Sequence, residues 1–148
     1  MSCEPPVVIG WKERVQFLDW GVRRVHVKID TGARTSALGA DYYTLAEDPV
    51  LGRVAELTIT FDRKRPDRQT TLRAPVLGFA VIANSAGMKE QRPVIETTVR
   101  VGPVTKLVQF TITNRSRMRF PVILGRRALA GDFLIDVQRA FTQKKRRK

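Results

Sequence analysis

The chain has 148 residues, 43% of them hydrophobic, and a formal net charge of +13. A chain of this length buries about 70% of its unfolded surface, which is enough for one domain with one core. No apolar run is long enough to span a bilayer, the first ten residues do not resemble a secretory signal, and the single cysteine excludes an internal disulfide. These features predict a cytoplasmic protein rather than a membrane or secreted one.

The positive charge is not confined to one end of the chain. Lys144 to Lys148 contribute five of the 27 basic residues, which leaves 22 basic against 14 acidic residues, or +8, for the rest. Such a protein attracts polyanions, and more strongly at low salt. Nucleic acid is one candidate, but aromatic residues make up only 7% and no stacking platform is interleaved with the basic residues. An acidic peptide fits the charge equally well.

Apolar residues follow the periodicity of β-strands along most of the chain. We expect residues 1–10 to form a flexible N-terminus, 11–141 to form one domain, and 142–148 to form a basic, disordered tail. No internal repeat is visible. The strands expected in chain order are Arg14–Trp20 and Val22–Ile29, which form a hairpin around Gly21, then Val54–Phe61, Val76–Ala83, Pro93–Val101 and Val104–Thr113.

The strand Val22–Ile29 leads directly into the triplet Asp30-Thr31-Gly32. A carboxylate at the end of a strand is held rigidly, the threonine hydroxyl can donate a local hydrogen bond, and glycine permits a close backbone approach. The same triplet is also an ordinary strand-end turn. Much further along, Pro121–Leu129 is an apolar run that ends in glycine and leads into a short helical stretch, which predicts a buried strand capped by a helical turn.

These two elements, in this order and separated by a β-rich stretch, resemble retroviral-type proteases, in which an apolar-apolar-Gly-Arg segment packs beneath the Asp-Thr-Gly loop. The resemblance is more specific to a bacterial family of the RimB type, which carries the label ATP-dependent zinc protease. Its members often accompany ATP-grasp ligases that add glutamates to protein tails. The resemblance covers about Trp11 to Phe141, and its motifs are Lys28–Ala37 (KIDTGARTSA), Arg92–Thr97 (RPVIET), Thr113–Met118 (TNRSRM) and Ile123–Val137 (ILGRRALAGDFLIDV).

The resemblance implies an all-β fold, a retropepsin-like closed β-barrel with one short C-terminal helix and one half-site per chain. An aspartic peptidase needs two carboxylates that share a proton. The implied enzyme is therefore a symmetric homodimer in which Asp30, Thr31 and Gly32 of both copies form the catalytic site. Two positions depart from relatives: Gly39 stands where many members have histidine, and Arg34 stands where viral proteases have an acid.

The resemblance also implies how substrate is held. Retropepsins close a β-hairpin flap over the substrate, and its tip is expected at Asn84, Ser85, Ala86 and Gly87, with an ordinary surface hairpin as the alternative. Arginine and lysine bind carboxylates, and the cations expected to contact an acidic substrate are Arg34, Lys89, Arg92 and Arg126. A structural role is the alternative for each of them, since Arg126 can brace the fold and Arg92 can pair with Glu96.

The residues argue against a metal or nucleotide cofactor. A catalytic zinc site needs about three His, Cys or carboxylate ligands. This chain has one histidine, His26, on a strand face with Arg24 and Lys28, and one cysteine, Cys3, near the N-terminus. It contains no His-Glu-x-x-His motif and no Gly-rich phosphate loop. We therefore expect no cofactor.

The favoured interpretation is a metal- and ATP-independent homodimeric aspartic endopeptidase that hydrolyses acidic, glutamate-rich chains, such as the polyglutamate tails added by ATP-grasp ligases. Its expected partners are a second copy of itself and an acidic peptide, including a glutamylated ribosomal protein, with no membrane and with nucleic acid only secondary. Two alternatives stay open. One is a non-catalytic basic module of the same fold that binds RNA or ribosomal protein, and the other is an endopeptidase with apolar specificity.

Overall fold

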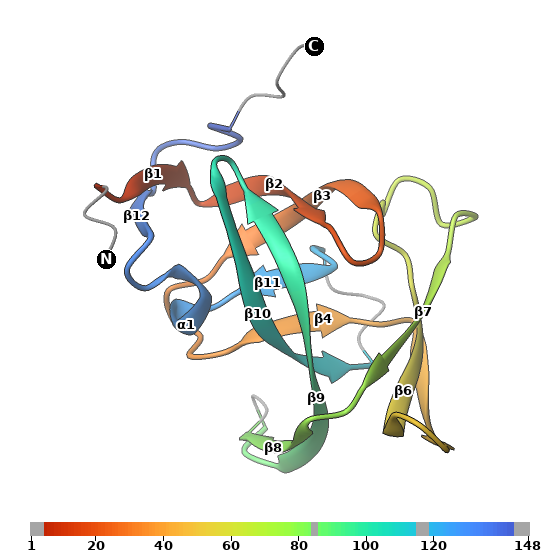
Figure 1. The fold of residues 1–148 in the computed structure, drawn as a ribbon. Helices are drawn as coiled ribbons and strands as arrows, with labels where there is room; N and C mark the ends of the chain where they lie inside the picture. The colour runs from red at the N-terminus through yellow and green to blue at the C-terminus, as the bar shows by residue number, and fades with distance from the viewer. Residues whose placement is uncertain (1–4, 84–85, 115–118, 144–148) are drawn as a thin grey trace.

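The computed structural model describes residues 5–83, 86–114 and 119–143, which form an almost entirely β structure (Figure 1). The elements in chain order are β1 (Val7–Gly10), β2 (Lys12–Phe17), β3 (Val22–Ile29), β4 (Ser36–Gly39), β5 (Tyr42–Asp48), β6 (Gly52–Ile59), β7 (Thr70–Pro75), β8 (Gly78–Ala83), β9 (Lys89–Val101), β10 (Val104–Thr113), β11 (Val122–Leu124), α1 (Arg126–Leu129) and β12 (Phe133–Asp136).

Six of the strands close into a ring. Each strand in the order β10-β4-β11-β3-β2-β9 is hydrogen-bonded to the next, and antiparallel pairing of β9 with β10 joins the two ends. Strand β8 extends this sheet beyond β9 as the outer strand of a hairpin. The all-β architecture, the closed ring and the single short helix in the described part of the chain confirm the predicted fold class.

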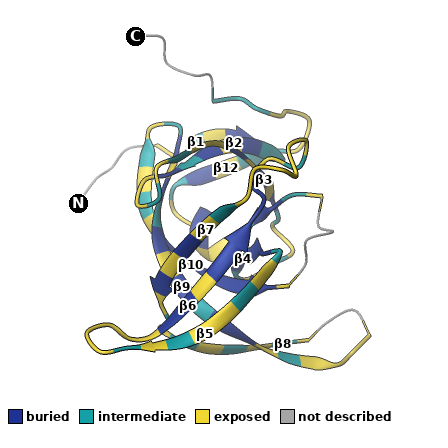
Figure 2. Cartoon of the chain, turned by 90° about the vertical axis from the view of Figure 1, so that its right-hand side faces the viewer, coloured by how far each residue is buried: buried dark blue, intermediate teal, exposed yellow. Residues whose placement is uncertain are grey.

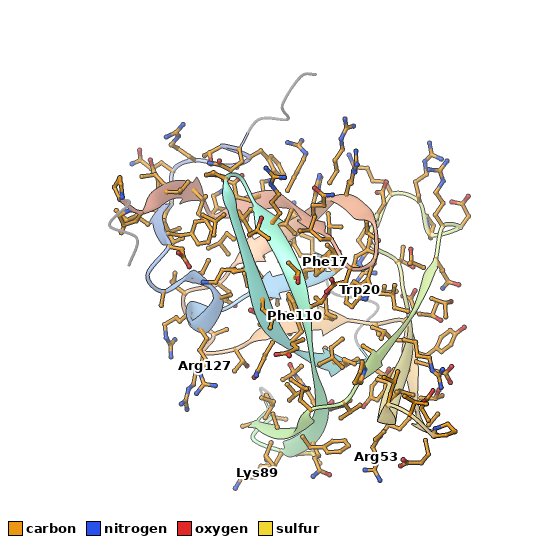
Figure 3. The ribbon with its side chains drawn as sticks, in the orientation of Figure 1. Phe17, Trp20, Arg53, Lys89, Phe110 and Arg127 are labelled. Carbon is orange, nitrogen blue, oxygen red and sulfur yellow. The ribbon has the colours of Figure 1, made fainter. Side chains whose placement is uncertain are left out.

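The ring encloses the hydrophobic core. Side chains along most of β9 and the first part of β10 alternate between the interior and the surface, as pleated strands do, whereas the last four residues of β10 are all buried. Ile95 and Phe110 are fully buried. Phe17 stacks on Trp20 with ring centroids 5.1 Å apart and lies 5.8 Å from Phe110 (Figure 3). Each such buried side chain contributes about 1.5–3 kcal/mol, so these rings are a main source of the stability of the barrel.

Two smaller sheets flank the ring. Strands β5, β6 and β7 form an antiparallel sheet in which β6 is largely buried and β5 is largely exposed (Figure 2). Strand β1 pairs in parallel with β12, so strands from opposite ends of the chain lie side by side. Strand β1 belongs to the segment that we expected to be flexible, and Ile9 within it is fully buried.

A buried carboxylate ties the C-terminal segment to these strands. Glu13 of β2 is fully buried and accepts hydrogen bonds from Gly10 N (2.7 Å), Thr142 N (3.0 Å) and Thr142 Oγ1 (2.6 Å). A buried charge is unfavourable unless it is hydrogen-bonded, and these donors compensate for its desolvation. Thr142, which we expected to begin a disordered tail, is therefore held against β2.

The predicted strands agree with the structure where hydrophobic alternation is regular. The hairpin around Gly21 is confirmed as β2 and β3, and the strand Val104–Thr113 coincides with β10. Strand β9 begins at Lys89, earlier than predicted, because its ladder with β8 continues through polar residues. In the ranges that the structure describes, no helix has the length and apolar character needed to cross a membrane.

Candidate active site

The Asp-Thr-Gly triplet lies where three strands meet. Strand β11 runs between β3 and β4, parallel to the first and antiparallel to the second. Asp30 directly follows β3, and its backbone N–H donates to Leu124 O of β11 at 2.9 Å. The apolar segment therefore packs against the triplet, as predicted.

The turn after β3 is closed by its own backbone and by the carboxylate. Ala33 N donates to Asp30 O (3.2 Å), and Gly32 N donates to Asp30 Oδ1 (3.0 Å). A Cβ atom at position 32 would lie only 3.2 Å from that Oδ1, so glycine gives the carboxylate room. Asp30 is half-buried, whereas Thr31 and Gly32 are exposed. The carboxylate is thus held in a defined position at the surface of the barrel.

Helix α1 holds the loop through its first two residues. Arg126 N donates to Ala33 O (2.8 Å), and Arg127 N donates to Arg34 O (3.1 Å). The Arg126 guanidinium also donates through Nη1 to Thr31 O (2.9 Å). This contact fits the bracing role that the sequence left open for Arg126.

The junction between β11 and α1 requires a glycine. Gly125 N donates to the hydroxyl of buried Ser36 (3.0 Å). A Cβ atom at position 125 would lie 2.5 Å from Thr35 O and 2.9 Å from Ala33 O, and both of these oxygens belong to the backbone that follows the triplet. The close approach of two backbone segments, rather than an unusual φ, therefore selects glycine here.

The β8–β9 hairpin occupies the place where the sequence predicted a flap. The two strands pair along the whole length of β8. Within the predicted tip, Ala86 and Gly87 are exposed, and the φ of Gly87 is 79°, a conformation that favours glycine. Asn84 and Ser85 lie outside the described residues.

A hollow of about 430 Å³ lies between this hairpin and helix α1. Ala80 of β8, Glu96 of β9 and Arg127 of α1 line it together with the middle of β10, and Thr35 connects it to the loop after the triplet. Figure 3 shows Arg127 and Lys89 on the same lower side of the molecule. Asp30 is not among the lining residues, so the hollow does not surround the carboxylate.

The cations predicted to contact substrate have different surroundings. Arg34 and Lys89 are exposed, and neither forms an ion pair within the described ranges. Arg92 is buried, with 9% of its side chain exposed, and it pairs with Glu90 (3.3 Å) rather than with Glu96. The Arg92 Nε atom has no hydrogen-bond partner. Arg34 and Lys89 are therefore the two that are free to meet an anion.

His26 is exposed on β3, as predicted for a surface histidine. Its ring centroid lies 4.9 Å from that of Phe141. Partial burial and the positive charge of Arg14 lower the pKa of His26. Among the residues with described positions, no three His, Cys, Asp or Glu side chains gather as metal ligands would, and Cys3 lies outside the described ranges.

Two residues of the site were not singled out from the sequence. Ser36 lies within the KIDTGARTSA motif, but no local pattern indicates that its hydroxyl meets a residue 89 positions further along. Arg127 is adjacent to Arg126 in the sequence, and a helix turns the two side chains in different directions. Only the position of α1 beside β10 places Arg127 at the hollow.

A closed barrel in which a short helix, a glycine and an apolar strand hold an Asp-Thr-Gly loop has the retropepsin-like fold, with one such loop per chain. The particular family follows from comparison with known proteins. A family model described as RimB-like, retropepsin-like aspartic endopeptidase RimB, matches residues 8–146. The chain belongs to this family, which confirms the resemblance found in the sequence.

Individual relatives support the same assignment. The chain is 31% identical over 134 residues to a probable alpha-L-glutamate ligase of Desulfotalea psychrophila, and 30% identical over 138 residues to one of Shewanella pealeana. These matches cover 87% and 90% of the chain but only 28% and 29% of the two relatives, so the chain spans less than a third of their length. The crystal structure of a Legionella pneumophila protein of unknown function has the same fold, with a TM-score of 0.77, 22% identity, and 95% of this chain and 100% of that one covered.

Proposed function

We propose that this chain is a homodimeric aspartic peptidase that hydrolyses peptide bonds in acidic, glutamate-rich chains without a metal or ATP. The observation that carries the proposal is the placement of Asp30. Its carboxylate is half-buried at the end of β3, and the loop that bears it is hydrogen-bonded to both β11 and α1. A peptidase of this chemistry needs two carboxylates, and each chain supplies one, so two copies would complete the site.

The proposed mechanism needs only the groups of the two loops. Two nearby carboxylates cannot both ionise at low free-energy cost, so one Asp30 would be ionised and the other protonated, with apparent pKa values that belong to the pair. The ionised carboxylate would take a proton from a water molecule as it attacks the scissile carbonyl. The protonated carboxylate would donate a hydrogen bond to the carbonyl oxygen, and the proton taken from the water would pass to the leaving amine as the C–N bond breaks. Thr31 of each copy would brace the paired loops.

The acidic substrate is supported by charge and by the names of the relatives. Arg34 and Lys89 are exposed without ion pairs in the described part of the chain, and Arg127 lines the hollow beside the loop. Guanidinium groups bind carboxylates in bidentate geometry. The relatives in which a similar region is joined to a longer sequence are named probable alpha-L-glutamate ligases. A hydrolase for glutamyl chains is the activity that would oppose such a ligase.

Mass spectrometry of poly-α-glutamate incubated with the protein tests the proposal, with a chelator present throughout. Wild type should shorten the chains, and Asp30→Asn should leave them intact while it keeps the fold and the dimer. Shortening by Asp30→Asn would exclude the carboxylate mechanism. If the wild type leaves poly-α-glutamate intact but cleaves apolar peptides, the acidic specificity is excluded while the peptidase activity stands.

Mixed dimers test whether the site is shared between copies. When equal amounts of wild type and Asp30→Asn exchange subunits at random, about a quarter of the dimers carry two copies of Asp30. Activity should therefore fall to about a quarter of that of the same total amount of wild type. A fall to only one half would mean that each chain works alone, and it would overturn the dimeric site.

A further inference from the structure

The outer face of the β2–β3 hairpin carries two rows of cationic side chains. The strands pair antiparallel, with Lys12 opposite Lys28 and Arg14 opposite His26. Neighbours on one face of a strand are two residues apart, or about 6.7 Å, so these cations are regularly spaced. Figure 3 shows nitrogen-tipped side chains projecting from this upper side of the molecule. We call it the cationic face, and its members are Trp11, Lys12, Arg14, Arg23, Arg24, His26, Lys28 and Phe141.

The cations of this face are not neutralised by acids. Across the described ranges, ion pairs are formed by Arg53, Arg63, Arg73, Arg92 and Lys106, and by none of the five Lys and Arg residues of the cationic face. The carboxylate of Glu13, which lies between two of them in the sequence, points into the core and is already hydrogen-bonded. Unpaired like charges repel one another, so such an arrangement favours an anionic ligand.

Aromatic rings lie among these cations. Lys12 Nζ is 4.7 Å from the ring centroid of Trp11 and 5.2 Å from that of Phe141. The Arg14 guanidinium carbon is 4.1 Å from the Phe141 centroid, and the His26 ring is 4.9 Å away. The sequence showed no stacking platform interleaved with basic residues, because Trp11 and Phe141 come from opposite ends of the chain. Folding brings them together.

The backbone of this face is also unusual. Among described residues other than glycine, positive φ occurs only at Arg24 (57°) and Phe141 (50°), and both belong to the cationic face. Arg23 and Arg24 lie in a bulge of the β2–β3 ladder, and Phe141 N donates to Lys12 O (2.9 Å). Such conformations are unfavourable for residues with a side chain and are concentrated at functional sites.

We propose that the cationic face binds single-stranded RNA. Proteins that hold single strands combine a basic track for the phosphates with aromatic rings on which bases stack, and this face has both. An acidic peptide would account for the cations but not for the half-buried aromatic rings of Trp11 and Phe141 among them. The proposal does not depend on the peptidase activity, since no member of the cationic face belongs to the Asp30 loop or lines the hollow.

Fluorescence anisotropy with a labelled single-stranded oligoadenylate of about twelve nucleotides tests the proposal. The double substitution Arg14→Ala with Lys28→Ala removes two cations and should weaken RNA binding about tenfold. The plot of log association constant against log salt concentration should become less steep, its negative slope losing about 1.4 in magnitude. Phe141→Leu should weaken binding about fivefold or more with the slope unchanged, because it removes a stacking surface but no charge. All three substitutions should leave the cleavage of poly-α-glutamate unchanged.

The matched control removes the same charge elsewhere. Arg53→Ala with Arg73→Ala takes two cations from β6 and β7, where both are ion-paired. If this control weakens RNA binding as much as the test pair does, the binding is non-specific and the proposal fails. The proposal also fails if truncation after Gln143, which removes the basic residues 144–148, abolishes RNA binding while Arg14→Ala with Lys28→Ala leaves it unchanged. Binding of a polyglutamate peptide to this face without RNA binding would assign it to acidic peptides instead.

His26 provides a local readout because it is the single histidine of the chain. Its neighbours are Lys12, Arg14, Lys64 and the opposing Asp62, and burial together with these cations lowers the pKa of His26. Phosphates bound at the face favour the imidazolium form, so oligoadenylate should raise this pKa in an NMR titration. An unchanged His26 pKa at saturating RNA would place the RNA elsewhere and overturn the proposal.

Discussion

At Gly125 the backbone of the β11–α1 junction runs directly against the backbone that follows Asp30. We expect Gly125→Ala to lower the free energy of unfolding by about 1–3 kcal/mol, because the new Cβ would overlap Thr35 O and Ala33 O and neither can move without displacing the loop. Urea unfolding measures the change. Gly78→Ala is the matched control, since its Cβ would meet no atom within 4 Å. Equal midpoints for the two variants would contradict the expected overlap.

Substitutions of Arg126 and Arg34 distinguish a residue that braces the Asp30 loop from one that binds substrate. Arg126 hydrogen-bonds Thr31 O, whereas Arg34 is exposed and unpaired in the described structure. If the proposed activity holds, Arg126→Met should lower kcat about tenfold with little change in KM, because the loop loses a charged hydrogen bond. Arg34→Met should raise KM for poly-α-glutamate and leave kcat nearly unchanged. Steady-state kinetics measures kcat and KM for both variants. A raised KM for Arg126→Met together with a lowered kcat for Arg34→Met would exchange the two roles.

Some residues of the candidate site could be predicted from the sequence and others could not. The positions of Asp30, Gly32 and Gly125 at the loop and its junction could be predicted because a short motif encodes the backbone geometry there. The bond from Ser36 to Gly125 could not be found, because it joins residues that meet only when β4 and β11 pair. For Arg92 a contact with substrate was predicted, with an ion pair to Glu96 as the alternative. The structure instead pairs Arg92 with Glu90, two positions back on the same face of the strand.

At the scale of elements, sequence patterns identified the strands that are buried on one face. Alternation in Val22–Ile29, and the turn at Gly102 and Pro103 ahead of Val104–Thr113, placed β3 and β10 to the residue. Strand β5 was missed because its residues are mostly exposed and carry no regular apolar alternation. Strands β1 and β12 were missed because each has four residues and gains its stability from a partner at the other end of the chain.

The turn between β2 and β3 is linked to β9 by one carboxylate. Asp19 accepts hydrogen bonds from Thr98 N (2.9 Å) and Thr97 Oγ1 (2.9 Å), which lower the pKa of Asp19 below its usual value of 3.8. A lowered folded-state pKa stabilises the fold above pH 3.8, and this stabilisation is lost as the pH falls through the folded-state value. We expect Asp19→Asn to be less stable than wild type at pH 7, and the difference should shrink as the pH falls below 3.8.

Urea midpoints measured from pH 7 down to pH 3 check this expectation. Asp67→Asn is the control, since this exposed residue lies in the loop before β7 and makes no hydrogen bond through its side chain in the described structure. A constant difference between Asp19→Asn and wild type across the whole range would show that the carboxylate does not stabilise the fold through its charge.

Glu13 connects three elements through one side chain. Its carboxylate joins β2 to the end of β1 and to Thr142. We expect Glu13→Gln to lower the free energy of unfolding by about 3 kcal/mol, because an amide offers one acceptor oxygen and brings donors that find no acceptor there. Chemical denaturation measures this loss. Glu47→Gln, at an exposed ion pair with Arg53, should change stability by less than about 1 kcal/mol.

At the scale of the whole molecule, the proposed enzyme should respond to dilution and to salt. Specific activity should fall when the protein is diluted below the dissociation constant of the dimer, because a lone Asp30 has no partner. KM for poly-α-glutamate should rise between about 0.1 and 1 M salt, where the Debye length falls from about 10 to about 3 Å. Activity assays across a dilution series and a salt series test both. Constant specific activity down to a protein concentration at which light scattering shows only monomer would exclude a shared site.

The order in which the chain is synthesised determines when the Asp30 loop can be held in its final position. Arg126, which hydrogen-bonds Thr31 O, lies 95 residues further along the chain. At about 5–20 residues per second, a ribosome needs about 5–20 s to translate that interval. The interval between β1 and its pairing partner β12 is longer still. Throughout this time the nascent chain carries Asp30 without β11, α1 or a closed barrel to position it. The Asp30 loop therefore cannot reach its described position until Arg126 has been translated.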